Sequence, residues 1–170
     1  MTGVQTCALP ICFPVTIRRP HTIEFWYLRA GTTETNGRIF QTRNGDLFSG
    51  VGIFFDATIT ASLKAYFSSS STAWTLQNVD IGLTSAAAWT HYAVVRNGTD
   101  ILTFANGTLT TTASIGTVSL YYNSADTVVI GGQTSGTSRS VNGYIDELRV
   151  TKGIARYTTN FTPPTEPFLF

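Results

Sequence analysis

The fold of this chain is decided by residues 89–114, which read WTHYAVVRNGTDILTFANGTLTTTAS. Two Asn-Gly pairs, at 97–98 and 106–107, separate three short runs that are rich in Val, Ile, Thr, Tyr and Phe. Asn and Gly tolerate the positive φ angles of a two-residue hairpin turn, and the flanking residue types favour extended backbone. The stretch therefore predicts two consecutive antiparallel hairpins.

Similar turn-forming pairs continue toward both ends of the chain. Further Asn-Gly pairs occur at 36–37, 44–45 and 142–143. Only residues 84–88 and 153–157 offer a turn of helix. The pattern predicts ten strands, at residues 22–29, 38–43, 50–56, 62–67, 74–80, 89–96, 100–105, 108–113, 127–131 and 143–151. Many short strands with Gly and Asn turns predict an all-β fold, an antiparallel β-sandwich of the jelly-roll type.

The composition restricts the partners of this 170-residue chain. Apolar residues make up 42% of it, but charged residues only 12%, about half the usual share of ~25%. With 29 Thr and 13 Ser, most outward positions carry hydroxyl groups. The net charge of +1 supplies no electrostatic surface for nucleic acid or anionic lipid, and no apolar run has the length of a membrane span. We therefore expect no nucleic-acid partner and no membrane insertion.

The first twelve residues, MTGVQTCALPIC, differ in character from the rest of the chain. They contain both cysteines, Cys7 and Cys12, whose spacing matches no zinc or thioredoxin pattern. The segment lacks the basic start and the long apolar run of a signal peptide. It resembles a translated sequencing adaptor of the kind found at broken ends of metagenomic genes. We expect residues 1–12 to be non-native and residues 13–170 to form one domain.

Four motifs occur in a fixed order along the chain. They are TIEFWY at 22–27, WTHYAVVRNG at 89–98, FANG at 104–107, and IGG at 130–132 followed by GYIDELRV at 143–150. Their order and spacing resemble the laminin G-like domains of the concanavalin A-like lectin/glucanase superfamily, especially the bacterial and phage form. The resemblance covers about residues 22–168. It implies a jelly roll of two antiparallel sheets, appended to extracellular enzymes, adhesins and virion tail proteins, and it specifies no ligand.

The acidic residues do not form the pair that a glycosidase needs. Glycosidases of this superfamily carry Glu-x-Asp-x-x-Glu on one strand, where a spacing of two aims the first two acids at one face. Here Asp146 and Glu147 are adjacent, so we expect them to point to opposite faces and to be structural. Neither His21 nor His91 has a nucleophile in a recognisable motif. The sequence predicts no enzyme, and a divergent glycoside hydrolase remains as one alternative.

Calcium is the one cofactor that the resemblance leaves open, because several relatives use it. A calcium site takes roughly six to eight oxygen ligands, usually with two or three carboxylates on loops. The position after residues 130–132 reads QTSG and lacks the acidic cluster of pentraxin-like relatives. The candidate ligands are Asp46 or Asp56 together with Asp80 or Asp126.

Three irregular segments, at residues 68–72, 121–125 and 133–141, are rich in small polar residues. Loops on a rigid β scaffold often carry binding groups, and aromatic side chains with neighbouring amides suit the apolar faces and hydroxyls of sugars. The candidate ligand-binding residues that flank these segments are Trp74, Asn78, Tyr121, Tyr122, Asn123 and Arg139. The other two tryptophans, Trp26 and Trp89, lie in motif strands and are expected in the core.

These observations favour a non-catalytic, lectin-like recognition module that binds a glycan or surface polysaccharide. It would be part of a larger secreted, cell-surface or phage tail protein, and we expect it outside the cell, at a cell surface or on a virion. A second alternative is a structural or adhesion module that contacts protein partners in a tail or surface assembly.

Overall fold

The computed structural model describes residues 19–31, 36–42, 48, 50–56, 61–123, 126–132 and 139–168. These residues form ten strands: β1 (His21–Arg29), β2 (Arg38–Gln41), β3 (Val51–Phe55), β4 (Ser62–Phe67), β5 (Leu76–Leu83), β6 (Thr90–Asn97), β7 (Asp100–Ala105), β8 (Thr108–Ser114), β9 (Val129–Ile130) and β10 (Gly143–Lys152). Every predicted strand is present, with ends shifted by a few residues. Within the described residues there is no helix, and so none that could cross a membrane. Residues 1–12, with Cys7 and Cys12, lie outside them.

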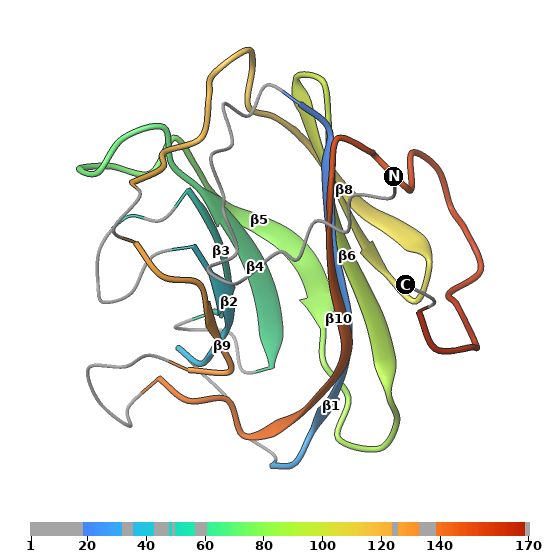
Figure 1. The fold of residues 1–170 in the computed structure, drawn as a ribbon. Helices are drawn as coiled ribbons and strands as arrows, with labels where there is room; N and C mark the ends of the chain where they lie inside the picture. The colour runs from blue at the N-terminus through green and yellow to red at the C-terminus, as the bar shows by residue number, and fades with distance from the viewer. Residues whose placement is uncertain are drawn as a thin grey trace, which may run out of the picture.

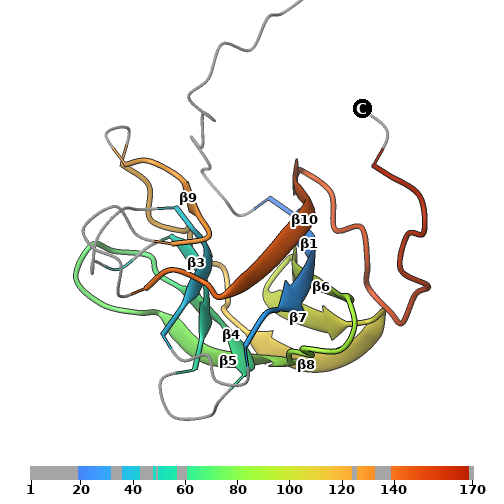
Figure 2. The same ribbon diagram turned by 90° about the horizontal axis from the view of Figure 1, so that it is seen from below.

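The strands form two antiparallel sheets that pack face to face (Figures 1 and 2). Sheet A has the order β10-β1-β6-β7-β8, and sheet B has the order β5-β4-β3-β2-β9. The sandwich predicted from the sequence is therefore confirmed. The two hairpins of the opening stretch connect β6 to β7 and β7 to β8, with positive φ at Gly98, Asn106 and Gly107. These are the backbone angles for which the Asn-Gly pairs are suited.

The main core lies between the two sheets and follows the two-residue period of the strands. In β1, Ile23, Phe25 and Tyr27 point inward and are at most 1% exposed. The inward residues of the other strands, such as Ile53 and Leu63 from sheet B, are equally buried. Because alternate residues fill this core, the residues between them lie on the two outer faces. These outer faces differ, and the difference determines where a ligand has access.

Part of the outer face of sheet A is covered by the C-terminal arm, which we define as residues 153–168. The arm runs beside the sheet without forming a strand (Figure 1, red trace at the right). Its residues Ala155, Tyr157 and Phe161 pack on a second, smaller core of Ala93, Val95, Leu102 and Phe104. The backbone N–H of Phe161 donates to the Gly107 carbonyl at 2.9 Å. A side chain at residue 107 would collide with the Phe161 carbonyl, so this hairpin requires glycine for packing as well.

Candidate functional site

The outer face of sheet B carries four aromatic rings in contact, which we call the aromatic platform: Phe48, Phe54, Tyr66 and Trp74. Trp74 lies at the centre, with its ring centroid 5.3 Å from Tyr66 and 6.1 Å from Phe54, and the Tyr66 and Phe54 centroids are 5.0 Å apart. Phe48 extends the group, 5.2 Å from Trp74. Phe54 is buried by its neighbours, but Tyr66 and Trp74 are only partly covered. The platform therefore presents ring surface to solvent.

Two neighbouring residues, Gly52 and Arg38, fix the position of the Phe54 ring. Gly52 precedes it on the same face of β3, and the ring occupies the space where a side chain of residue 52 would lie. The Arg38 guanidinium, from β2, is 4.5 Å from the centroid of the Phe54 ring. Arg38 also donates a hydrogen bond to Gln41 Oε1. Glycine at position 52 thus allows a large ring to lie flat on the sheet.

Polar groups border the partly exposed rings. The Tyr66 hydroxyl donates to Asn78 Oδ1 at 2.7 Å, and Lys64 Nζ donates to Asp80 Oδ1 at 2.8 Å. Burial, followed by the nearby Asp56 carboxylate, raises the pKa of Tyr66, so its hydroxyl stays protonated and acts as a donor. Asn78 has a φ of 58° at an irregular point of β5, and its side chain is exposed. Its Oδ1 is held by Tyr66, which orients the Nδ2 group as a donor.

The structure brings some of the predicted ligand-binding residues together. Trp74 and Asn78 both contact Tyr66 and belong to one surface. Tyr121 joins the same sheet at its end, because its N–H donates to the Ser68 carbonyl at 2.6 Å. Tyr122 and Asn123 follow it and are exposed. Arg139 lies at the other side of the sheet, where its carbonyl accepts from the Arg38 N–H at 3.0 Å.

The candidate calcium ligands do not fit a metal site in the part of the chain that is described. Asp46 lies outside the described residues. Asp80 binds Lys64, and neither Asp56 nor Asp126 belongs to a group of three or more His, Cys, Asp or Glu side chains among the described residues. A calcium ion needs several carboxylates together. We derive no step of ligand binding through calcium.

The outer face of sheet A contains a buried carboxylate, Glu24 of β1, which is 0% exposed. Arg149 donates to its Oε1 through Nε at 2.9 Å and Nη2 at 2.8 Å, and the Tyr157 hydroxyl donates to its Oε2 at 2.7 Å. His91 Nε2 lies 3.3 Å from the same Oε2. Burial raises the pKa of Glu24, but the groups of His91, Tyr157 and Arg149 outweigh it and hold the pKa below its usual value. Both carboxylate oxygens of Glu24 accept hydrogen bonds, so this residue links β10 and the arm to β1.

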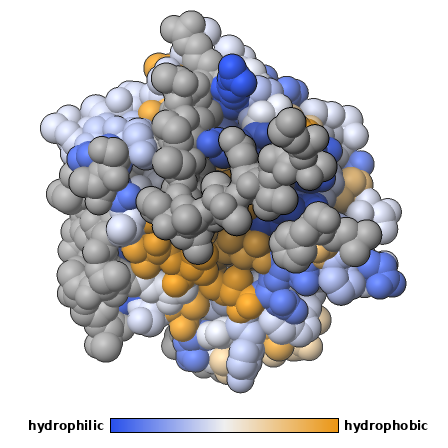
Figure 3. All heavy atoms as spheres, viewed as in Figure 1, coloured by the Kyte–Doolittle hydropathy of each residue, from blue (hydrophilic) through white to orange (hydrophobic). Residues whose placement is uncertain are grey.

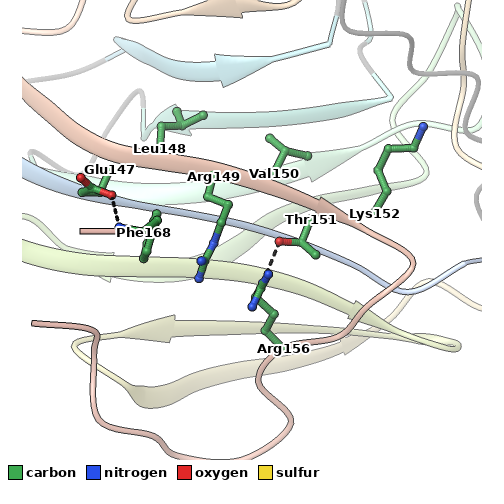
Figure 4. Close-up of a pocket in the computed structure, with 8 residues that line it drawn as sticks. All are labelled: Glu147, Leu148, Arg149, Val150, Thr151, Lys152, Arg156 and Phe168. Atoms are coloured by element: carbon green, nitrogen blue, oxygen red, sulfur yellow. Dashed lines mark hydrogen bonds between the residues drawn. The ribbon is translucent and has the colours of Figure 1, made fainter. Parts of the chain in front are cut away.

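A cavity of about 550 Å³ lies beside β10, and its polar groups serve the arm (Figure 4). The Arg149 guanidinium is 3.6 Å from the centroid of the Phe168 ring, and the Phe168 N–H donates to Glu147 Oε2 at 2.8 Å. Arg156 Nε donates to Thr151 Oγ1 at 2.7 Å. The close-up shows the Arg149 side chain pointing from β10 toward the arm and the Arg156 side chain pointing from the arm toward β10. The cavity is therefore a gap between the arm and β10, and these contacts hold the two together.

Two expectations about this side of the molecule were wrong. Trp26 and Trp89 do not lie in the core: Trp26 is on the outer face, and Trp89 is 41% exposed. The strict alternation expected for Asp146 and Glu147 is interrupted, because β10 has a bulge opposite Phe25 and Glu147 has a φ of 49°. The two acids therefore border one cavity. They are nevertheless structural: Asp146 Oδ1 accepts the Glu147 N–H at 2.9 Å, and Glu147 binds the arm.

Sequence reasoning missed Phe48, Phe54 and Tyr66 as members of the platform. A signal was present for Tyr66 in the alternation of its strand. Leu63, Ala65 and Phe67 form the apolar face, so Tyr66 lies with Lys64 on the outer face. For Phe54 the signal was ambiguous, because Phe55 follows it and either ring could have faced the core.

Several solved structures share this fold. Domain 4 of AbnA, a GH43 extracellular arabinanase from Geobacillus stearothermophilus, in complex with arabinotriose, has a TM-score of 0.54 and 16% identity, over 79% of this chain and 61% of that chain. Botulinum neurotoxin type C has a TM-score of 0.56 and 14% identity, over 79% of this chain and 32% of that chain. The botulinum neurotoxin serotype D binding domain has a TM-score of 0.55 and 11% identity, over 85% and 34%.

These likenesses show the fold alone, and this chain spans only about a third of the neurotoxin chains. Curated protein sequences give no significant match. A laminin G family model, described as "Concanavalin A-like lectin/glucanases superfamily", matches residues 3–155. With that match and two antiparallel sheets in the described residues, the chain belongs to the laminin G-like family of the concanavalin A-like lectin/glucanase superfamily.

Proposed function

We propose that this chain is a non-catalytic, lectin-like module that binds a glycan across the aromatic platform of sheet B. The observation that carries the proposal is the row of Phe48, Trp74 and Tyr66, with ring centroids 5.2 and 5.3 Å apart and polar side chains along its border. Sugar rings have apolar C–H faces that pack on aromatic rings, and their hydroxyls need hydrogen-bond partners at the edge.

The polar border has the donors and acceptors that such a ligand needs. Asn78 presents an amide whose oxygen is already held by Tyr66, so its Nδ2 group donates to a sugar hydroxyl. Lys64 and Asp80 hold each other at 2.8 Å, and the Asp80 side chain is 50% exposed. One charge of each sign side by side adds little net field, which suits a neutral oligosaccharide better than a highly charged one.

The comparisons support a sugar as the ligand. One structural neighbour is in complex with arabinotriose, and another interacts with two ganglioside molecules. Laminin G-like domains typically function outside the cell, and we place this chain in a larger secreted, cell-surface or phage tail protein. Its partner there is a glycan or surface polysaccharide. Catalysis is no part of the proposal, because Glu24, Asp146 and Glu147 all have structural partners.

The test begins with a glycan array and continues with calorimetry on the best neutral ligand. Trp74→Ala removes exposed ring surface from the platform, and we expect it to lower affinity about tenfold, the equivalent of about 1.4 kcal/mol. Tyr144→Ala is the matched control, because Tyr144 is an aromatic residue that is 61% exposed on β10 of the other sheet. Silence across the array, or equal affinities for the two variants, would contradict the proposal.

One observation favours the alternative of a protein-contact module. Figure 3 shows hydrophobic side chains gathered over β9 and β10, where Ile130 is 50% exposed and Val128, Val141 and Ile145 are only partly buried. Exposed apolar patches often mark protein interfaces. A silent array together with concentration-dependent association that Ile130→Asp abolishes would favour this alternative over the lectin.

A further inference from the structure

A second cavity, of about 380 Å³, lies between the outer face of sheet A and the C-terminal arm. Its aromatic lining is Trp26 of β1 and Trp89, which directly precedes β6. Residues 164–167 of the arm close another side, and they include Pro164 and Pro167. The volume is within the range of small-molecule sites, roughly 300–1,000 Å³.

The two tryptophans of this cavity are not used by either core. Trp26 meets His91 edge to face, with ring centroids 5.3 Å apart and an interplanar angle of 69°, so its orientation is fixed from one side. Trp89 is 41% exposed and is not part of either buried cluster. Tryptophans that pack neither core but line a cavity provide a surface for a ligand.

The remaining lining is acidic. Asp146, Glu147 and Glu166 all border the cavity. Asp146 and Glu147 accept backbone N–H groups, and neither they nor Glu166 form an ion pair with any Lys, Arg or His that the structure describes. Arg149, on the same strand as Asp146 and Glu147, lies against Phe168 and binds Glu24 instead. The cavity therefore combines indole rings and carboxylates with no basic residue in its lining.

This combination selects a cation that is bound to an apolar body. Both the π face of an indole ring and a carboxylate attract positive charge. A bare metal ion has no apolar surface to pack on the tryptophans, whereas a sugar ring with an ammonium substituent uses both parts of the lining.

We propose that this cavity, the Trp26–Trp89 pocket, binds a saccharide that carries a free amine, such as a glucosamine unit. The site goes beyond the proposed platform: it lies on the other sheet, uses different residues and prefers a positively charged sugar. Its loss and the loss of platform binding can therefore be separated by mutation.

The test compares a fully deacetylated glucosamine tetramer with its N-acetylated counterpart by calorimetry. Acetylation removes the charge and keeps the ring, so we expect the N-acetylated tetramer to bind at least tenfold more weakly. Glu166→Gln removes one exposed carboxylate from the arm and is expected to weaken binding of the amine form about fivefold at an unchanged melting temperature. Trp89→Ala should weaken it about tenfold, and Trp74→Ala, on the platform, should leave it unchanged.

Several outcomes would contradict the proposal that this pocket binds an amino sugar. They are no binding of the amine form, equal binding of both tetramers, full affinity in Glu166→Gln, and the same loss in Trp74→Ala as in Trp89→Ala. Spermidine binding as tightly as the glucosamine tetramer would show that the sugar ring is not recognised and would also overturn it. Because Glu166→Gln changes an exposed side chain, the result does not depend on whether Trp89→Ala folds.

Discussion

The two outer faces of the sandwich are built by the same strand alternation and differ in what covers them. On sheet A, the C-terminal arm supplies its own rings: Tyr157 and Phe161 stack 3.5 Å apart at an angle of 5° and pack on Phe104. On sheet B, the rings of Tyr66 and Trp74 contact each other and remain partly exposed. The rings of the arm are therefore used for stability, whereas the rings of the platform are accessible to a ligand.

The charged groups show the same contrast. On sheet A, Glu24 is fully buried and bonded by Arg149 and Tyr157. On sheet B, the pair of Lys64 and Asp80 lies at the surface, with the Asp80 side chain 50% exposed. Removing one partner of a buried ion pair leaves an unpaired charge, whereas an exposed pair contributes little. The comparison predicts that removing Glu24 or the arm rings packed on sheet A mainly lowers stability, whereas removing the exposed platform rings of sheet B mainly lowers binding of the neutral glycan.

The largest expected effect is that of Glu24→Gln. It leaves Arg149 without its carboxylate under the arm, and we expect a loss of about 3 to 5 kcal/mol in the free energy of unfolding. Asp80→Asn is the matched control at the exposed pair and should cost about 1 kcal/mol or less. Urea unfolding measures both. Similar losses for the two variants would remove the distinction between the faces.

The next effect is a dependence of stability on pH that also originates in β1. Burial, and to a smaller extent the charge of Arg96, lowers the pKa of His21 from 6.5 to about 4, against a raising contribution from the Arg19 carbonyl. Between these values the unfolded chain binds a proton that the folded chain does not. Stability should therefore fall by about 3 kcal/mol as the pH decreases from 6.5 to 4.

His21→Gln is the control for this pH range, because it cannot take up the proton, and its stability should be nearly constant there. Glu24 acts in a lower range: its pKa is held below 4.5, so its contribution is complete above 4.5 and is lost as the pH falls through the folded value. A slope between pH 6.5 and 4 that persists in His21→Gln would assign the effect to other groups.

A smaller loss of stability is expected when a ring of the C-terminal arm is removed. Phe161→Ala removes the ring that stacks on Tyr157, and because Phe161 is partly exposed we expect a loss of about 2 kcal/mol rather than the larger value of a core ring. Trp74→Ala, the platform counterpart, should cost about 1 kcal/mol or less. Thermal unfolding of the two variants, side by side, checks this order, and a greater loss in Trp74→Ala would reverse the roles of the faces.

A loss of stability no larger than that of Phe161→Ala is expected at Gly52, on which the platform is built. In Gly52→Ala the new methyl group displaces the Phe54 ring, which we expect to cost about 1 to 2 kcal/mol and to lower glycan affinity severalfold. Gly98→Ala is a comparison with free space around the added methyl group, but it has a φ of 64°, so its cost is conformational and should not change glycan binding. Calorimetry on both variants separates loss of the platform from loss of stability.

The strands could be predicted because alternation and Asn-Gly turns are local signals. It was harder to predict which face of a sheet each side chain occupies. Phe54 and Phe55 are adjacent rings, and only the pairing of β3 with β4 decides which one enters the core. Glu24 has no local sign of burial, since its cover comes from Arg149 and Tyr157 more than 120 residues away. Trp26 and Trp89 lie in motif strands, which favoured a core position, but the two residues instead line a cavity that the arm borders.

The most direct test of the account is a two-dimensional NMR titration of the labelled chain with the neutral oligosaccharide that the array selects. We predict shift changes at the Trp74 indole, at Asn78 and at the outward residues of β3, β4 and β5, with the amides under the C-terminal arm unaffected. Changes centred on β1, β6 or the arm, with none at Trp74, would contradict the assignment of sheet B as the glycan-binding face.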